Sequence, residues 1–283
     1  MRLLVTGAAG MLGHDVVATA GRAGHEVVSL ARAELDITDA DAVRSAVRDS
    51  HPDAILNCAA WTDVDGAEAA EAQATAINGA GAGHVAAAAA EAGAWVVHVS
   101  SDYVFDGDAR EPYVEAAAPA PRSAYGRSKL AGELAVAEAA PVTHTVARSS
   151  WLFGPHGKNF VDTMLRLGAG RDEVTVVDDQ VGCPTFTGHL APALVAVAEE
   201  RPRGILHVAG GGFCSWFELA RATFEEAGVD CTVKPGSTAE LGRPAPRPAF
   251  SALASTRGDA PALPPWREEL VAYLDEARTE ATR

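Results

Sequence analysis

Short apolar runs alternate with longer segments of helical periodicity along the first 210 residues of the chain. Continuous apolar runs are typical of parallel strands that are covered on both faces of a sheet. The predicted strands are residues 2–5, 26–30, 54–57, 95–100, 143–148 and 205–209. The predicted helices are residues 11–22, 39–49, 66–72, 78–92, 123–139 and 187–199. This alternation predicts an α/β fold with a doubly wound parallel sheet.

The alternation ends near residue 210. One clear helical pattern follows at residues 216–227, then a proline-rich stretch at 235–265 and a further helix from Trp266. A segment of this kind favours a smaller lobe whose loops fold over a ligand. We therefore expect residues 1–150 and 173–210 to form the sheet domain, and residues 151–172 and 211–283 to form a substrate-binding lobe.

Glycines with the spacing G-x-x-G-x-x-G follow the first predicted strand, at Gly7, Gly10 and Gly13. A helical pattern begins directly afterwards. Such glycines permit a tight turn and allow a pyrophosphate to approach the backbone at a helix N-terminus. A plain tight turn with packing glycines is the alternative, but the strand-turn-helix context favours dinucleotide binding. The sheet domain is therefore predicted to be a Rossmann-type dinucleotide-binding domain.

Tyr125 and Lys129 lie four residues apart at the start of a predicted helix, so they share one helix face. A free tyrosine titrates near ~10 and is a poor proton donor at neutral pH. A nearby ammonium favours the phenolate, so we expect Lys129 to lower the pKa of Tyr125. The pair is suited to giving a proton to a carbonyl oxygen while another group delivers hydride. By itself the Y-x-x-x-K pattern is weak, because two ordinary helix residues can produce it.

Composition excludes several classes of function. The net charge is −15, with 23 basic and 38 acidic residues, which argues against nucleic acid as a partner. The four cysteines lack metal-ligand spacing, and we expect reduced thiols in a cytoplasmic protein. The apolar run at residues 3–5 is too short for a signal peptide, and no run approaches the ~20 residues that span a bilayer. No membrane association is expected.

Further motifs extend the glycine and Tyr-Lys patterns over nearly the whole chain. They are residues 35–39, 100–107, 125–133, 148–151, 159–160, 179–185 and 247–249. With these segments the chain resembles the dTDP-4-dehydrorhamnose reductase family, in the extended branch of the short-chain dehydrogenase/reductase superfamily. The segments 100–107 and 180–185 are specific to that family rather than to the superfamily.

The resemblance implies an oxidoreductase that reduces the C4 keto group of dTDP-4-dehydro-L-rhamnose to give dTDP-L-rhamnose. One alternative is a 4-ketoreductase for another dTDP-deoxyhexose of antibiotic or glycan biosynthesis. Another, from a different class, is a non-catalytic regulatory subunit of methionine adenosyltransferase. That last function would fit better if the set of Tyr125, Lys129 and a strand-end serine were broken, and here it is intact.

The expected cofactor is NADPH, with NADH as the alternative. NAD-selective sites usually place an acid at the tip of the second strand. Here Arg32 follows that strand and is suited to a 2′-phosphate, although Asp36 lies nearby. The expected cofactor-binding residues are Gly7, Ala9, Gly10, Met11, Leu12, Gly13, Arg32, Asp36, Ile37, Ala59, Ala60, Thr62, Asn78, Ser100, Tyr125 and Lys129.

The expected catalytic residues are Tyr125, Lys129 and Ser101. A hydroxyl at Ser101 can stabilise negative charge on the carbonyl oxygen, and Ser100 is its competitor for this role. Asn78 resembles the helix asparagine that supports proton transfer in related enzymes, although a helix N-cap explains it equally well. The resemblance implies that the sugar nucleotide contacts Ser101, Tyr103, Tyr125, Trp151, Asn159, Gln180, Thr185 and Arg247.

No metal is expected. Some members of the family bind magnesium with acidic residues at a dimer interface, and Asp15 matches one of these positions. The later position falls near His189, where the sequence has no carboxylate. An imidazole is a poor ligand for magnesium, so the expected assembly is a monomer or a homodimer without that metal.

Overall fold

The computed structural model describes residues 1–281 and centres on one six-stranded sheet in which every pairing is parallel. Its strands are β1 (Arg2–Thr6), β2 (Glu26–Leu30), β3 (Ala54–Asn57), β4 (Trp95–Ser101), β5 (His144–Ser149) and β10 (Gly204–His207). The order across the sheet is β10-β5-β4-β3-β1-β2. All six predicted strands and the doubly wound α/β fold are thus confirmed.

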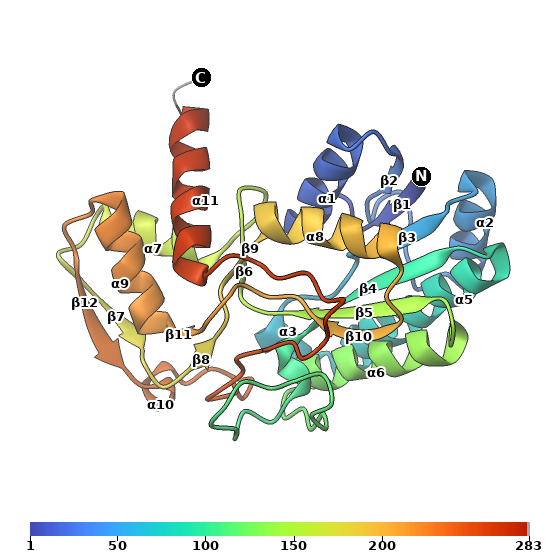
Figure 1. The fold of residues 1–283 in the computed structure, drawn as a ribbon. Helices are drawn as coiled ribbons and strands as arrows, with labels where there is room; N and C mark the ends of the chain where they lie inside the picture. The colour runs from blue at the N-terminus through green and yellow to red at the C-terminus, as the bar shows by residue number, and fades with distance from the viewer. Residues whose placement is uncertain (282–283) are drawn as a thin grey trace.

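Helices cover both faces of this sheet (Figure 1). One face carries α1 (Met11–Arg22) and α8 (Thr187–Glu200), and the other carries α2 (Ala40–Ser50), α5 (Ala82–Ala92) and α6 (Ala124–Ala139). Leu3 and Val5 of β1 pack toward α1 and α8, whereas Leu4 packs toward α2 and α5. Burial on both faces explains why these strands read as continuous apolar runs.

The segment between β3 and α5 departs from the predicted helices. Two short helices, α3 (Val64–Ala69) and α4 (Glu71–Thr75), lead into a π-helical turn at Ala76–Gly81. Asn78 therefore lies inside continuous helix, and its interpretation as a helix N-cap is wrong. π-Helical turns within helices frequently mark functional sites, because the extra residue redirects side chains.

A smaller lobe stands beside the sheet, on the left in Figure 1. Its helices are α7 (Phe160–Gly168), α9 (Trp216–Ala227), α10 (Thr238–Leu241) and α11 (Trp266–Ala281). Its strands pair as β7 (Glu173–Val177) with β12 (Thr232–Gly236), β6 (Leu152–Phe153) with β9 (Thr185–Phe186), and β8 (Val181–Gly182) with β11 (Cys214–Ser215). No helix within residues 1–281 has the length and apolar character needed to cross a membrane.

The pairing of β7 bears on where the two lobes divide. β7 pairs with β12 of the smaller lobe and not with the six-stranded sheet, whereas α8 packs on that sheet. The expected boundary at residue 173 therefore differs from the observed pairing. We propose that residues 1–150 and 187–210 form the dinucleotide-binding domain, and that residues 151–186 and 211–281 form the substrate-binding lobe.

Candidate active site

A cavity of about 1100 Å³ lies beyond the carboxyl ends of the central strands, against the smaller lobe. Ligands of open α/β sheets bind at this edge. Among the expected residues, the cavity is lined by Gly7, Ala9, Gly10, Met11, Leu12, Gly13, Arg32, Asp36, Ile37, Ala59, Ala60, Thr62, Ser100, Ser101, Tyr103, Tyr125, Lys129, Trp151, Asn159 and Arg247. The structure therefore brings 20 of the expected residues to one cavity. Asn78, Gln180 and Thr185 do not line it.

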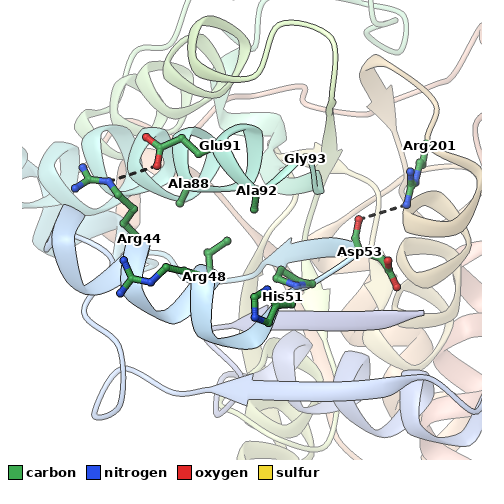
Figure 2. Close-up of a pocket in the computed structure, with 11 residues that line it drawn as sticks. Arg44, Arg48, His51, Asp53, Ala88, Glu91, Ala92, Gly93 and Arg201 are labelled. Atoms are coloured by element: carbon green, nitrogen blue, oxygen red, sulfur yellow. Dashed lines mark hydrogen bonds and ion pairs between the residues drawn. The ribbon is translucent and has the colours of Figure 1, made fainter.

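A second cavity, of about 600 Å³, lies at the opposite edge of the sheet, between the C-terminal ends of α2 and α5 (Figure 2). Its cations already have partners: Arg44 lies 3.6 Å from the carboxylate of Glu91, and Arg201 donates to the backbone oxygen of Asp53 at 3.3 Å. Cations at helix C-termini are expected from the helix dipole. None of the expected site residues lines this cavity, so the larger cavity is the candidate active site.

The glycine loop forms the floor of the large cavity between β1 and α1. Gly7 has a φ of +66°, and a Cβ at this position would lie 2.6 Å from the backbone nitrogen of Ala59. A Cβ at Gly13 would collide with the carbonyl oxygen of Gly7. These positions need glycine, because the loop passes close to the segment after β3 and to the first turn of α1. The cradle fits a pyrophosphate at the N-terminus of α1.

Arg32 is exposed at the rim of the cavity, just after β2. Two acids, Glu34 and Asp36, follow Arg32 closely, and each accepts a hydrogen bond from a backbone amide. Glu34 accepts a hydrogen bond from the amide of Ala31 at 2.8 Å, and Asp36 accepts from the amide of Thr38 at 2.9 Å and from its hydroxyl at 2.7 Å. Arg32 therefore leaves an exposed positive charge at the edge of the cavity.

Tyr125 and Lys129 enter the cavity from the first turns of α6, which begins at the N-cap Ser123. The side chain of Ser123 accepts a hydrogen bond from the amide of Gly126 at 3.0 Å. Lys129 is buried, and its Nζ donates to the carbonyl oxygen of Val99 in β4 at 2.7 Å. The ring of Tyr125 meets the ring of Tyr103 edge-on, with centroids 5.4 Å apart.

Burial governs the titration of both groups. It raises the pKa of Tyr125 to about 12, and a hydrogen bond with Ser101 opposes this rise. Burial also lowers the pKa of Lys129 to about 8, although the carboxylate of Glu133 favours its charged form. The expected net lowering of the Tyr125 pKa is wrong in this structure, because desolvation of the phenol outweighs the contacts that favour the phenolate. The phenol of Tyr125 is thus protonated at neutral pH.

The two candidate serines at the end of β4 have different partners. The hydroxyl of Ser100 donates to the Oε1 atom of buried Glu133 at 2.6 Å. The hydroxyl of Ser101 donates to Asp102 at 2.9 Å and is hydrogen-bonded with Tyr125. Ser101 is therefore the serine placed beside Tyr125, the candidate proton donor, which favours it over Ser100 for orienting a carbonyl oxygen.

Asn78 supports the cavity wall from behind. Its side chain accepts from the amide of Trp61 at 2.7 Å and donates to the carbonyl oxygen of Trp61 at 3.0 Å. It also donates to the hydroxyl of Ser128 at 2.9 Å. Asn78 therefore ties the segment after β3, which lines the cavity, to helix α6, which carries Tyr125.

A buried ion pair lies beneath the serines. Arg148 donates to Glu133 through Nε at 2.8 Å and through Nη2 at 2.6 Å, and both side chains are almost fully buried. Two parallel bonds of this kind hold both partners in one geometry. The pair therefore fixes the orientation of Glu133, which in turn accepts from Ser100 and favours the charge on Lys129.

Two stacked indoles form the wall on the side of the smaller lobe. Trp151 has a φ of +48°, which is rare for a bulky residue, and its ring lies 3.5 Å from the ring of Trp216 at an interplanar angle of 5°. Gln180 accepts from the indole nitrogen of Trp216 at 3.2 Å. Gln180 thus acts on the cavity through Trp216 rather than by lining it.

Two other residues that we expected to contact the substrate make hydrogen bonds within the protein. Thr185 is buried, donates to the carbonyl oxygen of Cys183 and accepts from the amide of Gly210 at 3.0 Å. Asn159 lines the cavity but is the N-cap of α7, where its side chain accepts from the amide of Asp162 at 2.9 Å.

Several residues of the cavity wall were not named individually as contacts of the cofactor or the substrate, although the segments 59–62, 100–103 and 149–151 were expected at the site from their place after predicted strands. They are Leu35, Cys58, Trp61, Val64, Ile77, Val99, Asp102, Ser149, Ser150, Leu152, Lys158, Phe160, Thr163, Trp216 and Arg243. Asp102 is notable because burial raises its pKa to about 6 beside Ser101. Several of these residues directly follow or precede an expected one, and Leu35, Asp102, Ser149, Ser150 and Phe160 lie in the motif segments described above. Trp216 and Arg243 carried no such signal.

One cluster of possible metal ligands occurs in the described part of the chain. The ligand atoms of His14, Asp15 and His156 lie within 4.8 Å of one another, and the Oδ2 atom of Asp15 is buried without a hydrogen-bond partner. His189 does not belong to this cluster. It lies 3.4 Å from the carboxylate of Glu269, a contact that the sequence did not predict. The expectation of no metal stays a prediction.

Comparison with known proteins agrees with this geometry. Residues 1–279 match the family model described as the RmlD substrate binding domain. A dTDP-4-dehydrorhamnose reductase of Mycobacterium tuberculosis is 47% identical, with 96% of this chain and 92% of the relative covered. A dTDP-4-keto-6-deoxy-D-glucose reductase of Streptomyces niveus is 46% identical, with 81% and 80% covered.

A solved structure shows the same architecture. The dTDP-4-dehydrorhamnose reductase of Bacillus anthracis, solved in complex with NADP, is 38% identical and superposes with a TM-score of 0.94, covering 97% of this chain and 99% of that one. The match extends over the sheet domain and the smaller lobe together. The chain therefore belongs to the dTDP-4-dehydrorhamnose reductase family, within the extended short-chain dehydrogenase/reductase superfamily.

Proposed function

We propose that this protein is an NADPH-dependent reductase that converts dTDP-4-dehydro-L-rhamnose to dTDP-L-rhamnose. The observation that carries the proposal is the meeting of the glycine loop, Tyr125, Lys129 and Ser101 in one cavity of about 1100 Å³. This volume slightly exceeds the roughly 300–1,000 Å³ of ordinary ligand pockets, which leaves room for more than one ligand. An intact proton-donating set argues against a purely regulatory subunit.

The cofactor end of the cavity is formed by the sheet domain. Gly7 to Gly13 and the N-terminus of α1 would hold the pyrophosphate, and Arg32 would pair with the 2′-phosphate. Ala59, Ala60 and Thr62 would allow the backbone to approach the nicotinamide half, with Lys129 beneath the ribose. When bound, the reduced nicotinamide supplies the hydride.

The chain itself supplies the proton and the polar contacts. Tyr125 donates its proton to the O4 oxygen of the sugar as C4 becomes tetrahedral, which completes the alcohol. Ser101 donates a hydrogen bond to the same oxygen and stabilises the charge that develops there. The charge of Lys129 then stabilises the phenolate left on Tyr125 until solvent returns a proton.

The sugar nucleotide would lie between the sheet domain and the smaller lobe. Tyr103 and Trp151 offer ring surfaces to the sugar or the base, and Arg247 offers a guanidinium to the diphosphate. Asn159 shapes the cavity at the start of α7. Gln180 and Thr185 would act indirectly, by fixing Trp216 and the loop after β10.

A second candidate substrate is another dTDP-4-keto-6-deoxyhexose, because the relative from Streptomyces niveus is nearly as similar as that from Mycobacterium tuberculosis. The test is NADPH oxidation against a panel of dTDP-4-keto sugars, with the configuration at C4 of each product assigned by NMR. Highest kcat/KM for dTDP-4-dehydro-L-rhamnose supports the first proposal, and a higher value for another sugar supports the second. No oxidation with any member of the panel contradicts both.

Assembly and location complete the proposal. We propose a cytoplasmic monomer or homodimer, with no nucleic acid as partner. All four cysteines are free thiols, as expected in a reducing compartment. Size-exclusion chromatography with light scattering distinguishes monomer from dimer.

A further inference from the structure

Asp65 connects the sheet domain to two arginines of the substrate-binding lobe. It lies in the first turn of α3, beside Val64, which lines the cavity. Its Oδ1 atom accepts from Nη1 of Arg247 at 2.6 Å and from the amide of Ala245 at 3.2 Å. Its Oδ2 atom accepts from Nη1 of Arg243 at 3.2 Å. One carboxylate therefore holds two guanidinium groups and the backbone between them.

Both arginines line the large cavity. Within residues 1–281, Arg247 donates its hydrogen bonds to Asp65 and to the carbonyl oxygen of Ala245, and both leave from Nη1. The Nε and Nη2 atoms are the donors left for a second anion. A guanidinium held by one nitrogen in this way can present its other edge to a phosphate.

The segment after Arg247 is anchored to the body of the protein by backbone contacts. The amide of Phe250 donates to the carbonyl oxygen of Gly107 at 3.1 Å, and the amide of Val181 donates to that of Ala249 at 2.9 Å. Asp65 holds the segment before these anchors. The pKa of Asp65 is lowered, first by the hydrogen bond from Arg247, so the carboxylate is charged at neutral pH.

We infer that Asp65 is a positioning residue that holds Arg243 and Arg247 over the sugar-nucleotide end of the cavity and thereby sets the affinity for the diphosphate. The inference rests on the proposed function for the identity of the ligand. Asp65 itself need not touch the substrate. Asp65 acts through the two arginines, whose orientation it sets before the ligand enters.

A role in stability alone makes different predictions. Arg243 and Asp65 are partly exposed, with 58% and 23% of their side chains accessible, and exposed pairs contribute little to stability. A residue needed only for folding would lower the melting temperature and affect both substrates alike. A positioning residue would affect the sugar nucleotide selectively.

The test is Asp65→Asn, which keeps the size of the side chain and removes its charge. We expect KM for the dTDP-4-keto sugar to rise roughly 10- to 100-fold, as is typical when a positioning contact is lost. KM for NADPH, kcat and the melting temperature should be unchanged. The Kd for dTDP, measured by isothermal titration calorimetry, should weaken by the same factor. Asp65→Glu, which keeps the charge, should recover part of the loss.

A double-mutant cycle tests whether Asp65 acts through the two arginines. In an Arg243→Ala, Arg247→Ala background, Asp65→Asn should cause no further loss of dTDP affinity. Glu71→Gln is the matched control, because Glu71 pairs with Arg127 at 2.6 and 2.9 Å and neither side chain lines the cavity. Glu71→Gln should leave both KM values unchanged.

The inference is overturned if Asp65→Asn leaves KM for the sugar and Kd for dTDP unchanged, or if KM for sugar and for NADPH rise together with a lower melting temperature. Full additivity in the cycle would also contradict it. Failure of the proposed function is a separate result: dTDP binding requires no turnover, so the Asp65 test stands even if no keto sugar is reduced.

Discussion

The ammonium of Lys129 donates a hydrogen bond to the backbone carbonyl of Val99 at 2.7 Å, and this contact joins α6 to the end of β4. The bond draws Lys129 beneath the cavity instead of leaving it on the helix surface. Because Ser101 ends β4 and Tyr125 lies in the first turn of α6, the same contact brings the serine and the tyrosine to one place.

The first prediction concerns the pH dependence of turnover. Burial lowers the pKa of Lys129 to about 8, so this side chain loses its charge as the pH rises through about 8. The phenolate formed on Tyr125 then lacks its stabilising cation, and kcat should fall across this range. Single-turnover rates measured with saturating NADPH and keto sugar give the profile. A rate that stays constant up to the ordinary lysine range near ~10 contradicts the assignment.

The second prediction concerns the proton donor. Tyr125→Phe keeps the ring but removes the hydroxyl, so kcat should fall by the ~10²–10⁴ typical of a lost general acid. NADPH binding, measured by fluorescence titration, should be retained because the glycine loop is untouched. Tyr103→Phe is the comparison, since its ring lies 5.4 Å from that of Tyr125 and we assign it no proton transfer. Near wild-type turnover in Tyr125→Phe would show that another group donates the proton.

The third prediction concerns cofactor preference. Arg32 is exposed at the cavity rim, while Glu34 and Asp36 are occupied by backbone amides. Arg32→Ala should therefore raise KM for NADPH more than KM for NADH, because only NADPH carries the 2′-phosphate. Steady-state kinetics with both cofactors measure the two changes. Equal losses, or none, count against a phosphate contact at this position.

The fourth prediction concerns stability. Burial raises the pKa of Glu269 to about 8, above the ~4.3 of an unfolded glutamate. The folded protein favours the protonated form of Glu269. The contribution of this group to the free energy of unfolding is therefore fully present below the unfolded pKa, and it is lost as the pH rises through about 8. Glu269→Gln should flatten the fall in melting temperature between about pH 5 and pH 8. The exposed Glu138→Gln is the control and should leave the slope as in the wild type; an unaltered slope in Glu269→Gln would contradict the prediction.

The fifth prediction concerns metal. Ser101 and Tyr125 can both donate hydrogen bonds to the developing alkoxide, so the reaction requires no Lewis acid. Activity should persist in excess EDTA, and chelation should leave the elution volume on size exclusion unchanged. The cluster of His14, Asp15 and His156 makes the experiment informative. Loss of activity restored by a divalent ion would show that this cluster, or another set of ligands, holds a required metal.

Local patterns were enough to predict the six-stranded sheet and the edge at which ligands bind. Strands buried on both faces must be apolar throughout, so Leu3 to Val5 could be recognised without knowing their neighbours. Gly7 and Gly13 were recognisable because the tight turn has no room for a Cβ. Strand ends in a parallel sheet share one edge, so Ser101 could be placed beside the glycine loop before any contact was known.

Other features arise only when distant segments meet. Strands of two residues, such as β6 and β9, carry no periodicity, and the pairing of β7 with β12 depends on a partner far along the chain. The contact of Asp65 with Arg247 joins the two lobes, and a charge alone does not reveal its partner. The upward pKa shift of Tyr125 is of the same kind, because desolvation depends on how much protein surrounds the phenol, and that is a property of the folded chain.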